Sequence, residues 1–273
     1  MTAHWSLRLL RNGVAWGLSA LMFIPLLLVV VNSFKDQISA NSMSMALPTR
    51  LEWSNYLIVI EQGKLLESFL NSLLYTSTST VFGLLLSAIA AYVFARNATK
   101  LNRFLYFFII MGIAMPTNFV TLTKVMQLTQ LINTQLGIIV LLTVGTIPFS
   151  VFLIYGFVNS VPRELDEAGI VDGCPPFKLF AWIVLPLLTP VLVTVAILNF
   201  MGAWNEFVLP LYYLNDSSKW PMTLAVYNFF GRFQVNWNLV SADIVLTTLP
   251  VIIIYLIGQR FIIAGMTSGS IKG

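Results

Sequence analysis

Residues 125–162 read VMQLTQLINTQLGIIVLLTVGTIPFSVFLIYGFVNSVP and contain no charged side chain over 38 positions. A helix needs about 20 mostly apolar residues to cross a bilayer, so this run is longer than one crossing requires. Its first part, residues 125–135, is rich in Gln, Thr and Asn, and we expect it to lie at the membrane interface. Residues 137–158 then remain to cross the membrane as a helix.

The whole chain shares this apolar character. Charged residues make up 10% of the 273 residues, whereas about 25% is usual in soluble domains. Apolar residues make up 58% and the mean hydropathy is +0.84, which is more apolar surface than a soluble domain can bury. The net charge of +4 is spread along the chain rather than gathered into a basic surface for nucleic acid. We therefore predict an all-α, polytopic helical membrane protein with a single domain, residues 1–273.

The charge-free runs predict six transmembrane helices. The last run, residues 244–259, is short, so Asp243 and Arg260 are expected to lie at the two membrane interfaces. An even number of crossings puts both termini on the same side. The predicted crossings are residues 12–33, 68–95, 104–123, 137–158, 186–207 and 240–263.

The distribution of Lys and Arg predicts the orientation, because cytoplasmic loops carry an excess of both residues. The strongest signal is residues 96–103, which contain three basic side chains among eight. Both termini are therefore predicted to be cytoplasmic, in a bacterial or archaeal inner membrane. The nine basic residues on the predicted cytoplasmic side are Arg8, Arg11, Arg96, Lys100, Arg103, Arg163, Lys178, Arg260 and Lys272, against six elsewhere: Lys35, Arg50, Lys64, Lys124, Lys219 and Arg232.

The predicted crossings contain little that could do chemistry. None contains a histidine, and none has an ionisable residue at mid-bilayer depth, as proton-coupled carriers usually have. The chain also lacks a phosphate-binding P-loop, since Gly63-Lys64 is followed by Leu65 rather than Ser or Thr. We therefore expect no catalytic residue, no metal site and no cofactor bound by this chain.

The loop at residues 159–185 is the most informative segment. Pro162 suits the first turn of a short helix, and Gly173 suits its C-terminal cap. Small residues, Ala168 and Gly169, would leave one helix face almost flat, so that another protein could approach closely. From spacing alone, a helix lying on the membrane surface and a helix that docks a partner are equally good interpretations.

This loop resembles the EAA signature of the membrane subunits of ATP-binding cassette importers. The signature is Glu-Ala-Ala, a nearby glycine, nine spacer residues and Ile-x-Leu-Pro. Here Glu167-Ala168-Gly169 precedes Asp172-Gly173, and residues 174–182 precede Ile183-Val184-Leu185-Pro186. The departure is Gly169, which replaces the second alanine and lowers helix propensity by about 1 kcal/mol.

Further matches are similar to the carbohydrate permeases of the maltose-transporter type, specifically their six-span partner subunit. They are residues 69–73 at the start of the second crossing, residues 202–207 with Trp204-Asn205-Glu206, and the glycine-rich tail at 265–273. The resemblance covers about residues 15–273 and implies the type I permease fold of these importers.

The resemblance implies a complex that imports a sugar. Two different permease subunits would form the channel, two ATPase subunits would bind ATP and Mg²⁺, and an extracytoplasmic solute-binding protein would deliver the substrate. The helix in the loop would be the coupling helix seated on one ATPase. The residues implied for this coupling are Glu164, Glu167, Ala168, Gly169, Asp172 and Gly173.

A second group of candidates lies near the outer end of the fifth crossing. Trp204, Asn205 and Glu206, with Asn199 before them, are interpreted either as an interfacial packing network or as the outer gate and sugar path. The aromatic loop at residues 211–238 is interpreted either as a contact for the binding protein or as an ordinary interfacial loop. A permease for glycerol phosphate, a polyamine or an amino acid, or a secondary carrier, remains as an alternative function.

Overall fold

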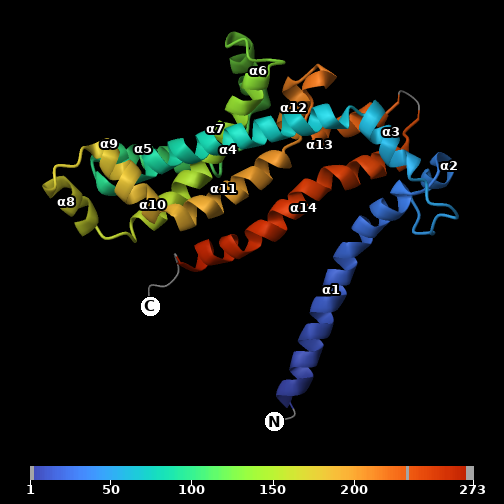
Figure 1. The fold of residues 1–273 in the computed structure, drawn as a ribbon, viewed down its shortest axis with the longest axis horizontal. Coiled ribbons are helices and arrows are strands. Elements are labelled where there is room, and N and C mark those ends of the chain that lie inside the picture. The colour runs from blue at the N-terminus through green and yellow to red at the C-terminus, as the bar shows by residue number, and fades with distance from the viewer. Residues whose placement is uncertain (1–2, 232–233, 269–273) are drawn as a thin grey trace. The chain divides into compact units, whose positions relative to one another are not determined.

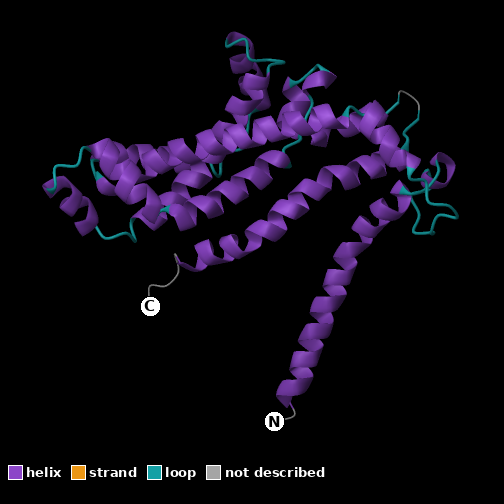
Figure 2. Ribbon diagram, viewed as in Figure 1, coloured by secondary structure: helices purple, strands orange, loops and turns teal. Residues whose placement is uncertain are grey.

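The computed structural model describes residues 3–231 and 234–268. Helices dominate it, and Figure 2 shows them joined by short loops. Within the described ranges, the only β-pairing is an isolated bridge between Phe230 and Val235. The four longest helices are α1 (Ala3–Ser33), α4 (Leu65–Arg96), α7 (Gln135–Val158) and α14 (Trp237–Ser268).

These four helices are long and apolar enough to cross a membrane, in their portions Arg11–Ser33, Leu65–Arg96, Gln135–Val158 and Trp237–Phe261. Helices long enough to cross the membrane therefore occur at four of the six predicted positions. A bent pair of helices that includes α11 (Thr189–Trp204) brings the number of possible crossings to five. The count of six remains a prediction. The predicted tail at residues 265–273 begins within α14, and its last five positions lie outside the described residues.

The chain divides into two compact units, and each of them combines two separate parts of the sequence. One unit combines the residues up to Leu66 with Ala225–Leu249, and the other combines Glu67–Leu224 with the residues from Pro250 onward. Every residue predicted for coupling or for the substrate path lies in the second unit, whereas the aromatic loop at residues 211–238 is divided between the two units at Ala225. The short helices of the first unit are α2 (Gln37–Ala40), α3 (Ser54–Gln62) and η3 (Val226–Phe229).

The first unit is held together by a buried amide network. Asn55 donates its Nδ2 hydrogens to the carbonyls of Ser33 and Lys35, both at 2.8 Å, and its Oδ1 accepts from Asn238 at 2.8 Å. The amine of Lys35 is also buried and donates to the Ser44 carbonyl at 2.6 Å. These bonds satisfy polar groups that would otherwise be costly to bury.

The core of the second unit forms where α4 presents a row of small residues. Close packing of membrane helices favours such residues because they let two backbones approach. The row packs against branched aliphatic side chains of α7 and α11. The buried members of this core are Ala88, Ala91, Ala95, Ile154, Val158, Val184, Leu188, Val191 and Val195.

The crossing predicted at residues 104–123 is not a continuous helix. Helix α5 (Lys100–Met111) ends before Gly112, and α6 (Phe119–Leu128) starts afresh after a non-helical stretch. Pro116 cannot donate an amide hydrogen bond and disfavours helix in the residue before it. Asn118 then caps α6 by accepting from the Thr121 amide at 3.1 Å. The 12 residues of α5 reach only about 18 Å, and Figure 1 shows α6 projecting away from α4 and α7.

The helix predicted at residues 186–207 starts later than expected. The chain first forms α9 (Pro176–Lys178), the π-helical η1 (Leu179–Val184) and α10 (Leu185–Leu187), and it then bends by 78° before α11. Pro190 explains the bend, because it has no N–H for the carbonyl of Pro186. That carbonyl accepts from the hydroxyl of Thr189 at 2.7 Å instead.

Candidate functional site

Helix α8 (Glu164–Val171) forms at the predicted place in the loop after α7. Three acidic residues in its first turn suit the positive end of the helix dipole. At its other end Gly173 has φ +74°, the left-handed conformation predicted for it. The amides of Gly173 and Cys174 donate to the carbonyls of Ile170 and Gly169 at 3.0 and 2.9 Å. These two bonds are a Schellman motif, which ends the helix sharply.

The faces of α8 differ from the expectation in one respect. Gly169 is buried, and a Cβ placed on it would collide with the side chain of Leu179 and lie 3.1 Å from Ile183 Cδ1. The predicted flat, open face at Gly169 is therefore wrong, because this glycine packs against η1 of its own chain. The other implied coupling residues are on the exposed surface: Glu164, Glu167, Ala168, Asp172 and Gly173.

The inner face of α8 carries a residue that the sequence analysis did not single out for a contact. Asp166 forms an ion pair with Arg96 at the end of α4, with Nε and Oδ2 2.7 Å apart. Tyr92, one turn earlier on α4, donates its hydroxyl to Asp166 Oδ1 at 2.8 Å. The two charged side chains are only 11% and 12% exposed. Two features of the sequence could have indicated this ion pair: Arg96 at the end of the predicted second crossing, and Asp166 as an additional acidic residue in the predicted short helix.

Two arginines reinforce this contact through main-chain carbonyls. Arg96 donates from Nη2 to the carbonyl of Val161 at 3.0 Å, and Arg163 donates from Nη2 to the carbonyl of Ala95 at 3.1 Å. Arg96, at the end of α4, therefore reaches the chain just before α8, and Arg163, just before α8, reaches the last turn of α4. Figure 1 shows α8 near the end of α4 that is remote from α3.

Large apolar side chains are exposed beside α8. Val171 is 85% exposed, Phe177 is 77% exposed and Trp182 is 79% exposed. Together with the carboxylates on the outer face of α8, they give this end of the unit a mixed acidic and apolar surface. Such a composition suits either a protein partner or the membrane interface.

The candidates near the end of α11 do not share one surface. Asn199 is buried and donates from Nδ2 to the Ser150 hydroxyl of α7 at 2.9 Å. The ring of Trp204 is also buried, with centroids 6.0 Å from Phe69 and 5.9 Å from Phe200. Both side chains therefore pack inside the chain in this structure.

Asn205 and Glu206 lie nearer the surface. Asn205 is exposed and donates from Nδ2 to the Met201 carbonyl at 2.9 Å. Glu206 Oε1 accepts from the amides of Val208 and Leu209 at 2.8 and 3.0 Å, so it caps α12 (Val208–Tyr213). The helix-end network that we considered for this segment is present, and a role in a substrate path remains a prediction.

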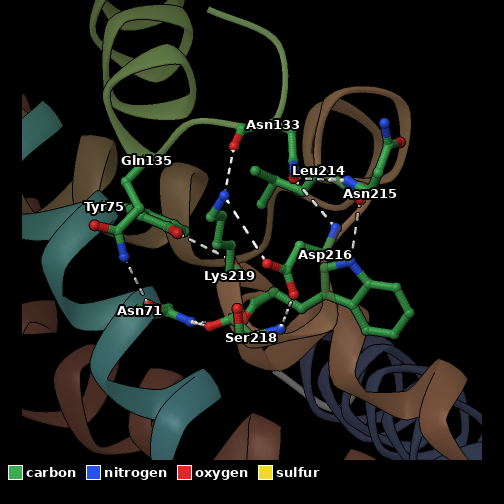
Figure 3. Close-up of polar contacts among 10 residues, drawn as sticks. Asn71, Tyr75, Asn133, Gln135, Leu214, Asn215, Asp216, Ser218 and Lys219 are labelled. Carbon is green, nitrogen blue, oxygen red and sulfur yellow. Dashed lines mark hydrogen bonds and ion pairs between the residues drawn. The ribbon is translucent and has the colours of Figure 1, made fainter.

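The loop after α12 is bound firmly to α4, as Figure 3 shows. Asn71 donates from Nδ2 to the carbonyls of Ser218 and Trp220 at 2.8 and 3.2 Å. Tyr75 donates its hydroxyl to the carbonyl of Lys219 at 2.9 Å. The loop contains η2 (Ser217–Lys219) and is followed by α13 (Met222–Ala225). All three contacts reach the loop through its main chain.

The segment before α7 holds the other side of this loop. Asn133, at φ +58°, accepts at Oδ1 from the amides of Asn215 and Asp216 at 3.1 and 3.2 Å. Its carbonyl accepts from Lys219 Nζ at 2.8 Å. We call residues 214–220 the anchored loop, since both α4 and the segment around Asn133 hold it (Figure 3).

Comparison with known proteins identifies this architecture. Residues 83–268 match the family described as "Binding-protein-dependent transport system inner membrane component". The matched region includes α8, the bend before α11 and the anchored loop.

Two relatives and one solved structure match nearly the whole chain. The diacetylchitobiose uptake system permease protein NgcG of Streptomyces coelicolor is 30% identical and aligns over 93% of this chain and 85% of its own. The melibiose/raffinose/stachyose import permease protein MelC of Bacillus subtilis is 32% identical over 92% of both chains. In fold, the chain is similar to part of a bacterial ABC transporter involved in importing the acidic polysaccharide alginate. The TM-score is 0.80 at 21% identity, with 93% of this chain and 96% of that chain covered.

Proposed function

Because this chain belongs to the binding-protein-dependent transport system inner membrane components, we propose that it is a permease subunit of an ATP-driven sugar importer. It would carry a sugar or oligosaccharide across the cytoplasmic membrane by alternating access. The names of NgcG and MelC, which are oligosaccharide permeases at 30% and 32% identity, support the substrate class. The observation that carries the proposal is α8, a capped helix with an exposed acidic face in the predicted loop.

In this proposal α8 is the coupling helix. The exposed carboxylates of Glu164, Glu167 and Asp172 face outward, where they would meet basic residues of an ATPase subunit. Ala168 lies between them, and its small side chain lets another protein approach this face closely. Gly173 ends the helix without a side chain, which leaves room at its C-terminal end.

This chain works with partners that supply what it lacks. Two ATPase subunits bind ATP and Mg²⁺, so the chain itself contributes no catalytic residue and no cofactor site. A second, different permease subunit completes the channel, and an extracytoplasmic solute-binding protein delivers the sugar. The basic residues of the α4–α5 connection, together with Arg163 and Lys178 in the loop around α8, support a cytoplasmic location for α8 and for both termini.

The substrate side lies at the other end of the unit. The anchored loop would face the binding protein, with the exposed side chains of Asn215 and Asp216 and the neighbouring Tyr212 at the surface. Asn205 and Glu206 are the best placed of the predicted path residues, because Asn199 and Trp204 are buried. Sugars are bound by stacking on aromatic rings and by hydrogen bonds from amides and carboxylates.

The test of the coupling role is Glu167→Lys. Reversing the charge of one partner in an interfacial ion pair places like charges together and costs several kcal/mol. We expect normal amounts of inserted permease that keep the second permease but lose the ATPase subunits on detergent extraction and transport little. The matched control is Glu61→Lys, the same change at an exposed position of α3, which should keep the ATPases.

Normal transport by Glu167→Lys with the ATPases still bound would refute α8 as the coupling helix. The substrate class has its own test, in which the reconstituted complex is supplied with binding proteins loaded with different solutes. Stimulation of ATP hydrolysis by sugars alone is expected. Stimulation by glycerol phosphate, a polyamine or an amino acid would refute the sugar as substrate, and the assignment as an importer permease would still stand.

A further inference from the structure

We propose that Asp166, Arg96 and Tyr92 form a joint through which movement of α8 is transmitted to the transmembrane helix α4. This inference rests on the proposed function, in which an ATPase displaces α8. It assigns to these three residues a positioning role in coupling, separate from the docking role of the exposed carboxylates. The geometry that carries it is the buried ion pair between the two helices.

The four acidic residues at α8 and its cap divide into two groups. Glu164, Glu167 and Asp172 are exposed, and within the described residues none of them forms an ion pair. Asp166 is turned inward, with a side chain that is only 11% exposed. A partner protein cannot reach a carboxylate in this position, so docking does not explain its presence. Its charge serves a contact inside the chain.

The joint resists separation because its groups are nearly out of water. Opposite charges attract more strongly where solvent screening is weak, and removing one partner leaves the other buried and unpaired. Tyr92 adds a charge-assisted hydrogen bond to the second oxygen of the carboxylate at 2.8 Å. The two main-chain bonds from Arg96 and Arg163 hold the same contact from either side. A displacement of α8 therefore moves the end of α4.

A second contact lies on the same buried face of α8, because Gly169 comes three residues, nearly one helical turn, after Asp166. Gly169 lets Leu179 and Ile183 of η1 pack directly on the helix backbone. The buried face of α8 therefore contacts both α4 and the segment that leads to α11. A displacement of α8 is therefore transmitted to both α4 and α11. The ion pair provides the polar contact with α4, and the packing at Gly169 provides the apolar contact on the side of α11.

The test is Asp166→Asn in the complete complex with its ATPases and binding protein. Asparagine keeps the shape of the side chain but removes the charge that Arg96 requires. We expect the ATPases to stay bound, because the exposed face of α8 is unchanged. ATP hydrolysed per sugar transported should rise about fivefold, within the range that changes in a coupling network produce. The control is Lys100→Gln, at an exposed basic position where α5 begins just after α4. It should leave this ratio unchanged.

Two further variants keep the test decisive if Asp166→Asn assembles poorly. Asp166→Asn combined with Arg96→Gln removes the unpaired charge, and it should restore assembly while the ratio stays raised. Tyr92→Phe keeps the ion pair and loses one hydrogen bond, so its ratio should rise about twofold. A variant that assembles normally and keeps the original ratio overturns the inference.

The outcomes also separate this inference from the function beneath it. If Glu167→Lys keeps its ATPases, the coupling helix itself has been misassigned. If Glu167→Lys releases them while Asp166→Asn transports with the original ratio, only the joint is refuted. A parallel fall of transport and ATP hydrolysis in Asp166→Asn, at normal assembly, would show a structural role without transmission and would likewise refute the joint.

Discussion

Helix α4 holds a polar segment near each of its ends, and the two attachments differ in kind. Near its start, Asn71 and Tyr75 bind main-chain carbonyls of the anchored loop. Near its end, Tyr92 and Arg96 bind the side chain of Asp166. The first attachment does not depend on which side chains the loop carries, whereas the ion pair and the tyrosine bond of the second depend on one carboxylate. A contact to main chain leaves a surface free to change in sequence, and a contact to a side chain does not.

The strongest test of this comparison reverses the polarity of the loop attachment. Asn71 is buried and donates to two carbonyls, so Asn71→Asp sets a carboxylate against two acceptors. The cost should be about 3 kcal/mol or more. Hydrogen exchange of the amides in residues 214–220 should accelerate about 100-fold, and Asn71→Ala should accelerate it less, by about tenfold. Unchanged exchange in both variants would assign the anchoring to Asn133 and Lys219 instead.

A smaller effect is expected at the end of α8, where the backbone rather than a side chain is constrained. Gly173 has φ +74°, which a β-branched residue adopts at a cost of about 2 kcal/mol. Gly173→Val should therefore accelerate limited proteolysis between residues 172 and 178 by about tenfold. Gly173→Asn is the matched control, because asparagine tolerates the left-handed region. Equal cleavage of the valine variant and the unaltered protein would contradict this account.

The smallest effect is expected where the comparison predicts tolerance. The anchored loop uses the carbonyl of Ser218 for its bond to Asn71. Ser218→Ala should therefore change the free energy of unfolding by less than about 0.5 kcal/mol. Amide exchange across residues 214–220 should match that of the unaltered protein. Faster exchange would mean that the serine side chain also holds the loop.

Sequence alone predicted the features that depend on local composition. Long apolar runs gave the helices around residues 68–95 and 137–158, and a glycine at the end of a short helix predicted the left-handed turn at Gly173. These features were predictable because each depends on residues that are close together in the sequence. The acidic first turn of α8 belongs to the same class.

Features that depend on distant or competing residues were not predicted. Hydropathy counted residues 104–123 as one crossing, but Pro116 and the cap at Asn118 divide them into two helices. The ion pair of Asp166 joins residues far apart in the chain, and its Tyr92 contact spans 74 positions. Gly169 was assigned to the outer face because one short helix does not reveal which side the chain itself will cover.

The fit of Gly169 against Leu179 affects how this protein could be recombined with its relatives. A relative that carries Glu-Ala-Ala at this place brings an extra methyl group, which would occupy the space that Leu179 fills here. The side chain of Leu179 thus fills the space left by the missing side chain at Gly169. A chimera that exchanges α8 alone would break this match, so residues 164–183 should be transferred as one cassette. The small residue in the motif and the large one ten positions later form a single packing unit.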